Sequence, residues 1–169
     1  DLSKESSSII ERYDTAPLVP RERISKKWNN HPHYADHVDS LGKLLLLARR
    51  LCEQGAGFVT VTTSFVWDMH ADGNNLNMID GMEAVGRAFD HAVAALIEDL
   101  RARNLQNDIL VVATGEMGRT PRINQSLGRD HFATAWSTTL SGCGIKGGAC
   151  YGKTSPDGGE VVDGKISAP

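Results

Sequence analysis

Five side chains that can bind a metal ion lie in two short segments, far apart in the sequence. Asp68 and His70 follow the apolar run at 58–63, whereas Glu116, Asp130 and His131 follow the run at 109–114. Carboxylate oxygen mixed with imidazole nitrogen suits Zn²⁺, Mn²⁺ or iron, because Mg²⁺ and Ca²⁺ prefer oxygen ligands alone. These side chains therefore form a candidate site for a divalent metal, with zinc or manganese favoured and calcium or magnesium as alternatives.

The same residues also have purely structural explanations. Asp68 can cap a turn, Glu116 can pair with Arg119, and Asp130 can pair with the adjacent Arg129. Composition and position favour neither interpretation over the other.

The strands and the helix expected around these residues would bring all five to the same edge of a sheet. Residues 58–63 (FVTVTT) and 109–114 (ILVVAT) are β-branched runs typical of strands, and an apolar stripe at helical spacing covers 82–103. A strand–helix–strand unit is right-handed and makes its two strands parallel, so both carboxyl ends reach one edge of the sheet. Ligands bind at that edge in open α/β sheets.

The remaining elements complete the expected architecture. Apolar residues at helical spacing predict an amphipathic helix over 38–52. Residues 132–140 are typical of a strand, and residues 142–154 of a hairpin or tight loop with a short strand. Residues 1–35 are polar and contain three prolines, which indicates a loose arm. We expect an α/β fold, a mostly parallel sheet sandwiched by helices, with residues 36–169 forming part of one domain.

Length and charge exclude some classes of partner. A chain of 169 residues is long enough for one domain, and its net charge of −3 gives no reason to expect nucleic acid. No run reaches the roughly 18 apolar residues of a membrane span, and the first residues lack the apolar core of a signal peptide. Because the sequence starts without Met and stops without a closing element, we expect a piece of a longer protein.

Two other groups of residues resemble metal ligands. His31, His33 and His37 have a usable spacing, but Pro32 and the lack of a neighbouring carboxylate pattern favour a surface or helix-entry role. Cys143 and Cys150 flank a Gly-rich turn without the further ligands that a zinc site needs, and whether they pair is open.

Residues 147–154 (GGACYGKT) satisfy the G-x-x-x-x-G-K-[ST] pattern of a phosphate-binding P-loop. A P-loop requires a helix directly after the motif, because the helix N-terminus holds the phosphates. The following SPDGGEVVDG does not favour a helix, so we interpret the match as accidental and keep nucleotide binding as the least favoured function.

Several blocks, in this order and spacing, resemble a bacterial family of domains of unknown function, number 1501. They are FVTVTTSFVWDMH, DILVVATGEMGRTPRIN, GRDHF and SGCGIKGGACYGKT, of which GEMGRTP and GRDH are the most specific, and the resemblance covers Asp36 to Ser167. The family is itself similar to the sulfatase and alkaline phosphatase superfamily. Its members typically carry Gly-Gly-Trp-Asp-Thr-His where this chain has Phe65 to His70, so the Asp and His are kept and the glycines are replaced.

The resemblance implies roles for the candidate residues. Asp68, His70 and His131 resemble the ligands of one metal, and Glu116 stands where related hydrolases reach a second metal. Arg119 would contact a phosphate or oxyanion, and Asp130 would orient His131. It also implies an alkaline-phosphatase-like fold, of which this chain is the C-terminal portion, with the nucleophile in an N-terminal half.

These implications lead to two functional hypotheses. The first is a metal-dependent hydrolase of phosphate or sulfate esters, acting on a small-molecule or polysaccharide substrate and incomplete in this chain. The second is a non-catalytic, exported binding or scaffold protein that retains the fold. A periplasmic or exported location is implied by the resemblance alone, and no oligomeric state is predicted.

Overall fold

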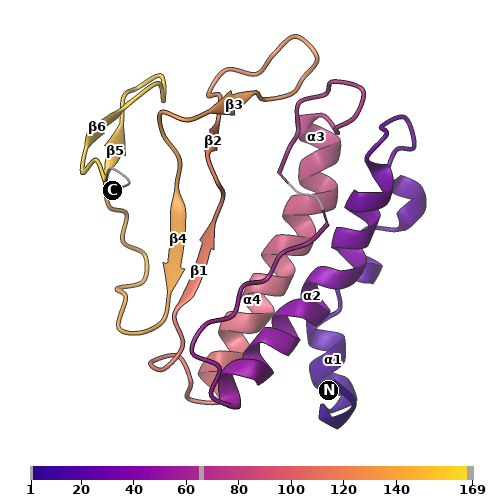
Figure 1. Ribbon diagram of the computed structural model, residues 1–169, viewed down its shortest axis with the longest axis vertical. Coiled ribbons are helices and arrows are strands. Elements are labelled where there is room, and N and C mark those ends of the chain that lie inside the picture. Colours follow the sequence, from indigo (N-terminus) through magenta and orange to yellow (C-terminus); the bar gives the residue numbers. More distant parts are fainter. Residues whose placement is uncertain (1, 65–66, 167–169) are drawn as a thin grey trace.

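A computed structural model describes residues 2–64 and 67–166, and it consists of a helical layer with strand pairs beside it (Figure 1). The helices are η1 (Leu2–Lys4), α1 (Ser7–Tyr13), η2 (Ala16–Leu18), η3 (Arg21–Arg23), α2 (His31–Glu53), α3 (Met78–Gly81), η4 (Met82–Gly86) and α4 (Arg87–Ala102). The strands are β1 (Val111–Thr114), β2 (Gly118–Arg119), β3 (His131–Phe132), β4 (Thr138–Ser141), β5 (Lys153–Thr154) and β6 (Val161–Asp163).

The two predicted amphipathic helices are confirmed. α2 begins seven residues before the expected start, because Pro32 lies in its first turn, where a missing N–H costs no hydrogen bond. The second helix is continuous through α3, the π-helical turn η4 and α4, and its first turn is capped by the Asn77 side chain, which accepts from the Asp80 N–H at 2.9 Å.

The core is formed between these helices and the N-terminal segment. Tyr34 and Val38 of α2 and Val85 and Ala88 of the second helix are completely buried in one cluster. Residues 2–30 add buried side chains to this cluster and to a second one around Leu46, namely Tyr13, Val19, Ile24 and Trp28. Gly42 permits the close approach of α1, since a β-carbon there would overlap the Tyr13 carbonyl oxygen.

A buried guanidinium ties three helical segments together. The Arg49 side chain is fully buried and lies 3.0 Å from carboxylate oxygens of Glu5 and Asp99 and 2.5 Å from Glu53. The Tyr13 hydroxyl donates to Asp99 at 3.1 Å. Because a buried charge is tolerated only when it is paired, these contacts fix α1, α2 and α4 in one arrangement.

The predicted parallel sheet is wrong, and with it the alkaline-phosphatase-like α/β fold. The described strands form three separate antiparallel pairs, β1–β4, β2–β3 and β5–β6. Val112 opposes Leu140, and Thr114 opposes Thr138 in the longest pair. β1 therefore pairs with a later strand, beyond β2 and β3 in the sequence, and not with a strand preceding the helix.

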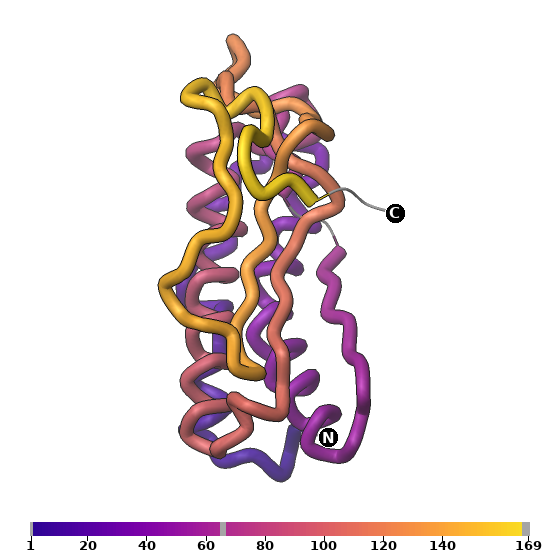
Figure 2. Tube along the Cα trace, turned by 90° about the vertical axis from the view of Figure 1, so that its left-hand side faces the viewer, coloured from indigo at the N-terminus to yellow at the C-terminus, as the bar shows by residue number. Residues whose placement is uncertain are grey.

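Residues 58–63 do not form the expected strand. They run beside the helices, with exposed and half-buried residues alternating as in a strand, but their backbone makes no hydrogen bond to another described segment. Figure 2 shows this segment, in magenta, apart from the strand pairs in orange and yellow. A β-branched run without a pairing partner can have the extended backbone of a strand, but it makes none of the hydrogen bonds that join neighbouring strands in a sheet.

The C-terminal region removes the P-loop hypothesis. Lys153 and Thr154 form β5, and the residues after them form a turn that leads into β6. The helix that would hold phosphates is therefore not formed within residues 155–166. Among the described helices, none has both the length and the apolar character needed to cross a membrane.

Candidate metal and anion site

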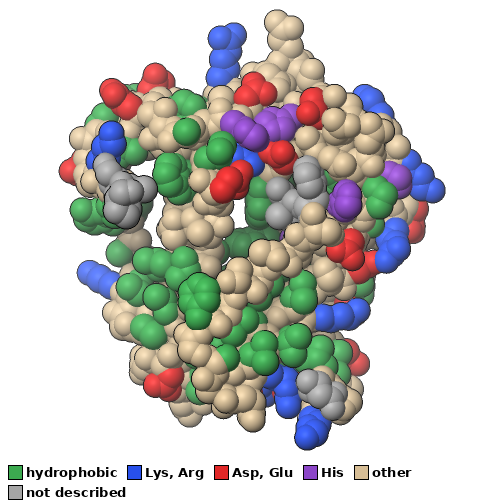
Figure 3. Space-filling model, viewed as in Figure 1, with side chains coloured by type: hydrophobic (Ala, Val, Ile, Leu, Met, Phe, Trp, Pro, Cys, Tyr) green, Lys and Arg blue, Asp and Glu red, His purple; other side chains and the backbone are tan. Residues whose placement is uncertain are grey.

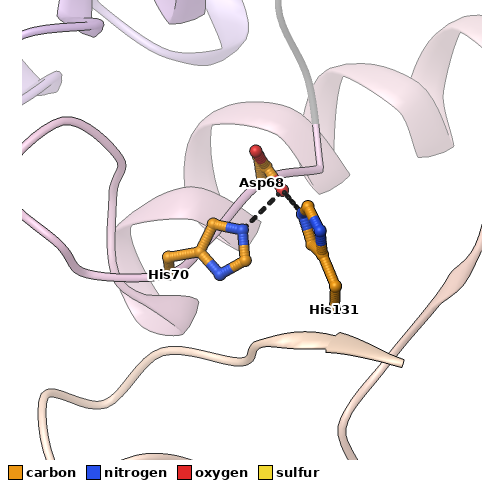
Figure 4. A group of neighbouring side chains, drawn as sticks. All are labelled: Asp68, His70 and His131. Carbon is orange, nitrogen blue, oxygen red and sulfur yellow. Dashed lines mark hydrogen bonds and ion pairs between the residues drawn. The ribbon is translucent and has the colours of Figure 1, made fainter. Parts of the chain in front are cut away.

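One carboxylate oxygen, Asp68 Oδ1, is the centre of the candidate site. It lies 2.8 Å from His70 Nε2 and 3.1 Å from His131 Nε2, and the two imidazole rings are tilted with centroids 4.7 Å apart (Figure 4). Asp68 and His70 come from the loop before α3, whereas His131 begins β3. The structure thus brings together three predicted ligands that are separated by up to 63 residues.

Arg119 joins Glu116 to this centre. Its Nη2 lies 3.0 Å from Asp68 Oδ1 and 3.0 Å from Glu116 Oε1. A hydrogen bond from its own backbone N–H, together with the Arg119 guanidinium, holds the pKa of Glu116 below its ordinary value. Glu116 thus pairs with Arg119, as the purely structural interpretation predicts. The Arg119 guanidinium contacts both Glu116 and Asp68 and so links the two carboxylates.

The backbone around Asp68 has an unusual conformation that Arg119 also supports. Trp67 has a φ of 58° and Ala71 a φ of 57°, values that non-glycine residues seldom adopt. Arg119 Nε donates to the Trp67 carbonyl at 3.2 Å. The arginine therefore fixes both the main chain before Asp68 and the Asp68 carboxylate itself.

The loop 120–130 packs against the other side of the same segment. The Arg129 N–H donates to the Met69 carbonyl at 2.9 Å, and Gly128 lies so close that a β-carbon would be 2.1 Å from the His70 oxygen. Asn124 Nδ2 donates to the His70 carbonyl at 3.1 Å and to Asp130 Oδ1 at 3.2 Å. The loop therefore fixes the position of His70 through backbone contacts.

Asp130 lies next to His70, with its Oδ1 3.7 Å from Nδ1 of that ring. The resemblance implies an orienting contact of Asp130 with His131, and the structural alternative is a pair with Arg129. Arg129 instead donates through Nη1 to the carbonyls of Thr120 and Pro121. The separation of 3.7 Å is longer than a hydrogen bond, and a small approach of Asp130 would give the carboxylate–Nδ1 contact that orients an imidazole whose Nε2 binds a metal.

Other residues are placed apart from the site or were missed. His37 is buried against Thr63 and Val85, and Cys143 and Cys150 are exposed free thiols. The sequence analysis does not identify Asn124, whose side chain contacts the His70 carbonyl. Its position in the turn-forming sequence NQSLG could have indicated it, because an Asn side chain often accepts hydrogen bonds from backbone N–H groups in a turn. Here the Asn124 Oδ1 accepts from the N–H groups of Ser126 and Gly128.

The donor set fits a divalent transition metal. Metal–ligand distances of about 2.0–2.2 Å place tetrahedral ligand atoms roughly 3.4 Å apart. The contacts of 2.8 and 3.1 Å are a few tenths of an ångström shorter, so small side-chain rotations would admit an ion. Asp68, His70 and His131 supply one oxygen and two nitrogens, a set that favours Zn²⁺ or Mn²⁺.

The fold and the site together define a helical domain with antiparallel strand pairs that carries a carboxylate, imidazole and guanidinium cluster at one end. A family described as protein of unknown function (DUF1501) matches residues 1–169, and the chain therefore belongs to that family. The membership predicted from the motifs is confirmed, and the match includes the first 35 residues. No curated protein and no solved structure matches the chain.

Proposed function

We propose that this protein is a metal-dependent hydrolase of phosphate or sulfate esters. The observation that carries the proposal is the convergence of His70, His131 and Arg119 on Asp68 Oδ1. Two neutral imidazoles and one carboxylate are the ligands of many catalytic zinc sites, and an adjacent guanidinium matches the geometry of an anionic oxyester.

Each group has a role that follows from its position. Asp68, His70 and His131 would hold the metal, which supplies Lewis-acid polarisation of a phosphoryl or sulfuryl oxygen when bound. Arg119 would orient the anionic group and compensate its charge, because its Nη2 already lies 3.0 Å from an Asp68 oxygen. Asp130 would orient His70, and Glu116 would keep Arg119 in place.

The motifs GEMGRTP and GRDH contribute Glu116, Arg119, Asp130 and His131 to this arrangement. The family that these motifs indicate is expected to be similar to the sulfatase and alkaline phosphatase superfamily, and this expectation supports the choice of ester. The proposal rests on the geometry of the cluster and not on an alkaline-phosphatase-like sheet, because the described strands form antiparallel pairs.

One observation favours a second candidate, a non-catalytic binding or scaffold protein. Asp68 Oδ1 contacts three nitrogen atoms and Arg119 Nη2 contacts two carboxylates, so these groups have polar partners within the protein without an ion. Such a network can be purely structural. The two candidates differ in metal content.

Elemental analysis of the full-length protein, purified without chelators, tests the proposal. We expect bound zinc or manganese in the natural protein and its loss in the double variant Asp68→Asn, His131→Gln. The matched control is Asp90→Asn, His91→Gln on α4, which should keep the metal. Loaded protein should then cleave 4-nitrophenyl phosphate or 4-nitrophenyl sulfate.

Absence of metal from both the natural protein and the control, even after addition of Zn²⁺ or Mn²⁺, would refute the proposal and favour the binding protein. Metal binding without cleavage of either ester would exclude hydrolysis of these substrates and retain the site as a metal-binding one.

A further inference from the structure

A cavity of about 520 Å³ adjoins the metal and anion site, between the second helix and the β1–β4 pair. Its volume falls in the range of small-molecule sites in proteins, roughly 300–1,000 Å³. Figure 3 shows the histidines of this face, in purple, beside acidic and basic side chains, with hydrophobic side chains below them. The cavity and the charged groups thus share one face of the molecule.

Large apolar side chains line much of the cavity. They come from the loop before α3, the second helix and the segment 132–136, and include Met69, Met78, Met82, Phe89, Phe132 and Trp136. Methionine side chains are flexible and polarisable, so they adapt to apolar groups of different shapes. Such a wall favours an aryl or alkyl group over a sugar, whose hydroxyls need many hydrogen-bonding partners.

The aromatic part of the wall is held in place before any ligand binds. The rings of Trp67 and Phe89 meet edge to face, with centroids 5.4 Å apart and an interplanar angle of 85°. The Trp67 carbonyl accepts from Arg119. A fixed wall reduces the conformational entropy that ligand binding would otherwise cost.

The polar end of the cavity lies at the metal and anion site. Arg119, Glu116 and Arg129 belong to the wall, and Asp68 contacts Arg119 directly. The three carboxylates of this end, Asp68, Glu116 and Asp130, outnumber the two guanidiniums by one, so a bound divalent cation would change its net charge from about −1 to about +1. Only the loaded site would therefore attract a phosphate or sulfate group strongly.

We propose that this cavity binds the apolar aryl or alkyl group of an amphiphilic phosphate or sulfate ester, with the anionic group at Arg119 and the metal. This inference rests on the proposed function, and it names the substrate class of the same site. Polysaccharide esters are thereby disfavoured as substrates.

Binding of two phosphonates to the zinc- or manganese-loaded, full-length protein tests the inference. Their carbon–phosphorus bonds resist hydrolysis, so affinity is measured separately from catalysis. We expect 2-naphthylmethylphosphonate to bind at least 100-fold more tightly than methylphosphonate, since the naphthyl group would leave water for an apolar cavity. Both ligands should bind more weakly after the metal is removed.

A pair of variants locates the site. Ser137 is exposed and lines the cavity, so Ser137→Trp should fill it from a loop and reduce the naphthyl advantage to less than about 5-fold. Thr134 is exposed in the preceding turn outside the cavity wall, and Thr134→Trp should leave both affinities unchanged. Methylphosphonate should bind equally to both variants.

The outcomes separate the inference from the proposed function. Metal-dependent binding of both phosphonates with equal affinity would overturn the apolar cavity and leave the hydrolase proposal standing. Failure of both to bind the loaded protein would refute the hydrolase proposal as well. Equal naphthyl binding with and without metal, or with Ser137→Trp, would overturn the inference that the cavity and the anion site hold one ligand.

Discussion

Arg119 Nη2 lies 3.0 Å from Asp68 Oδ1, although 51 positions separate the two residues in the sequence. The same nitrogen lies 3.0 Å from Glu116 Oε1. This guanidinium is therefore shared between the candidate metal ligand and the loop after β1, and its removal should affect anion binding and metal binding differently.

We expect Arg119→Gln to weaken phosphate binding about 10- to 100-fold, the effect of losing a charged hydrogen bond worth roughly 1.5–3 kcal/mol. Metal affinity should change less than phosphate affinity, because removal of a positive charge next to Asp68 offsets the loss of the hydrogen bonds from Arg119 to the Asp68 carboxylate and the Trp67 carbonyl. Isothermal titration with Zn²⁺ and then with phosphate measures both. The control is Arg122→Gln, at an exposed residue of the next loop. If R119Q lost metal affinity and phosphate affinity to the same extent, the role of Arg119 in anion binding would be contradicted.

Gly128 is expected to be essential for the position of His70. Gly128→Ala would place a methyl group 2.1 Å from the His70 carbonyl oxygen, so the two loops must separate. Overpacking of this kind typically costs about 1–3 kcal/mol of unfolding free energy, and metal affinity should fall with it. Chemical denaturation and metal titration check both effects against Gly57→Ala, where a β-carbon meets nothing within 4 Å. Equal stability of the two variants would show that the loops accommodate the methyl group.

His37 is expected to make folding stability depend on pH below neutrality. Burial lowers its pKa from the ordinary value of 6.5, and its ring contacts Thr63 Oγ1 at 2.9 Å and the Val85 carbonyl at 3.3 Å. A neutral ring that donates from Nε2 to Val85 and accepts at Nδ1 satisfies both contacts. The unfolded chain takes up a proton near pH 6.5 and the folded protein does so only at lower pH, so this stabilisation is complete above pH 6.5 and decreases below it.

Uptake of one such proton changes the unfolding free energy by at most about 1.4 kcal/mol per pH unit. Urea denaturation between pH 7.5 and 5 measures it, and His37→Gln, which keeps an N–H donor without titrating, should reduce the slope. The matched control is His91→Gln, at a partly exposed ring on α4. An unchanged slope in H37Q would assign the pH dependence to other groups.

The helices show how much local sequence determined. Apolar residues at a spacing of three and four specify which face of a helix is buried, and this pattern located α2 and α4 from the side chains alone. The composition of the site was readable for a similar reason. Asp68, His70, Glu116, Arg119 and His131 have the side chains for metal and anion chemistry wherever they lie.

The strands and the origin of the site's geometry were decided only by tertiary structure. Residues 58–63 and 109–114 have similar β-branched sequences, yet only the second region contains a paired strand, because pairing depends on which segments meet across the fold. The reason expected for the two loops to meet, parallel strands ending at one edge, was therefore wrong. They are joined instead by Arg119 and by the contacts of Gly128 and Arg129 with the segment at 69–70. Side-chain chemistry is a local property of the sequence, whereas proximity depends on contacts between distant residues that only the folded chain specifies.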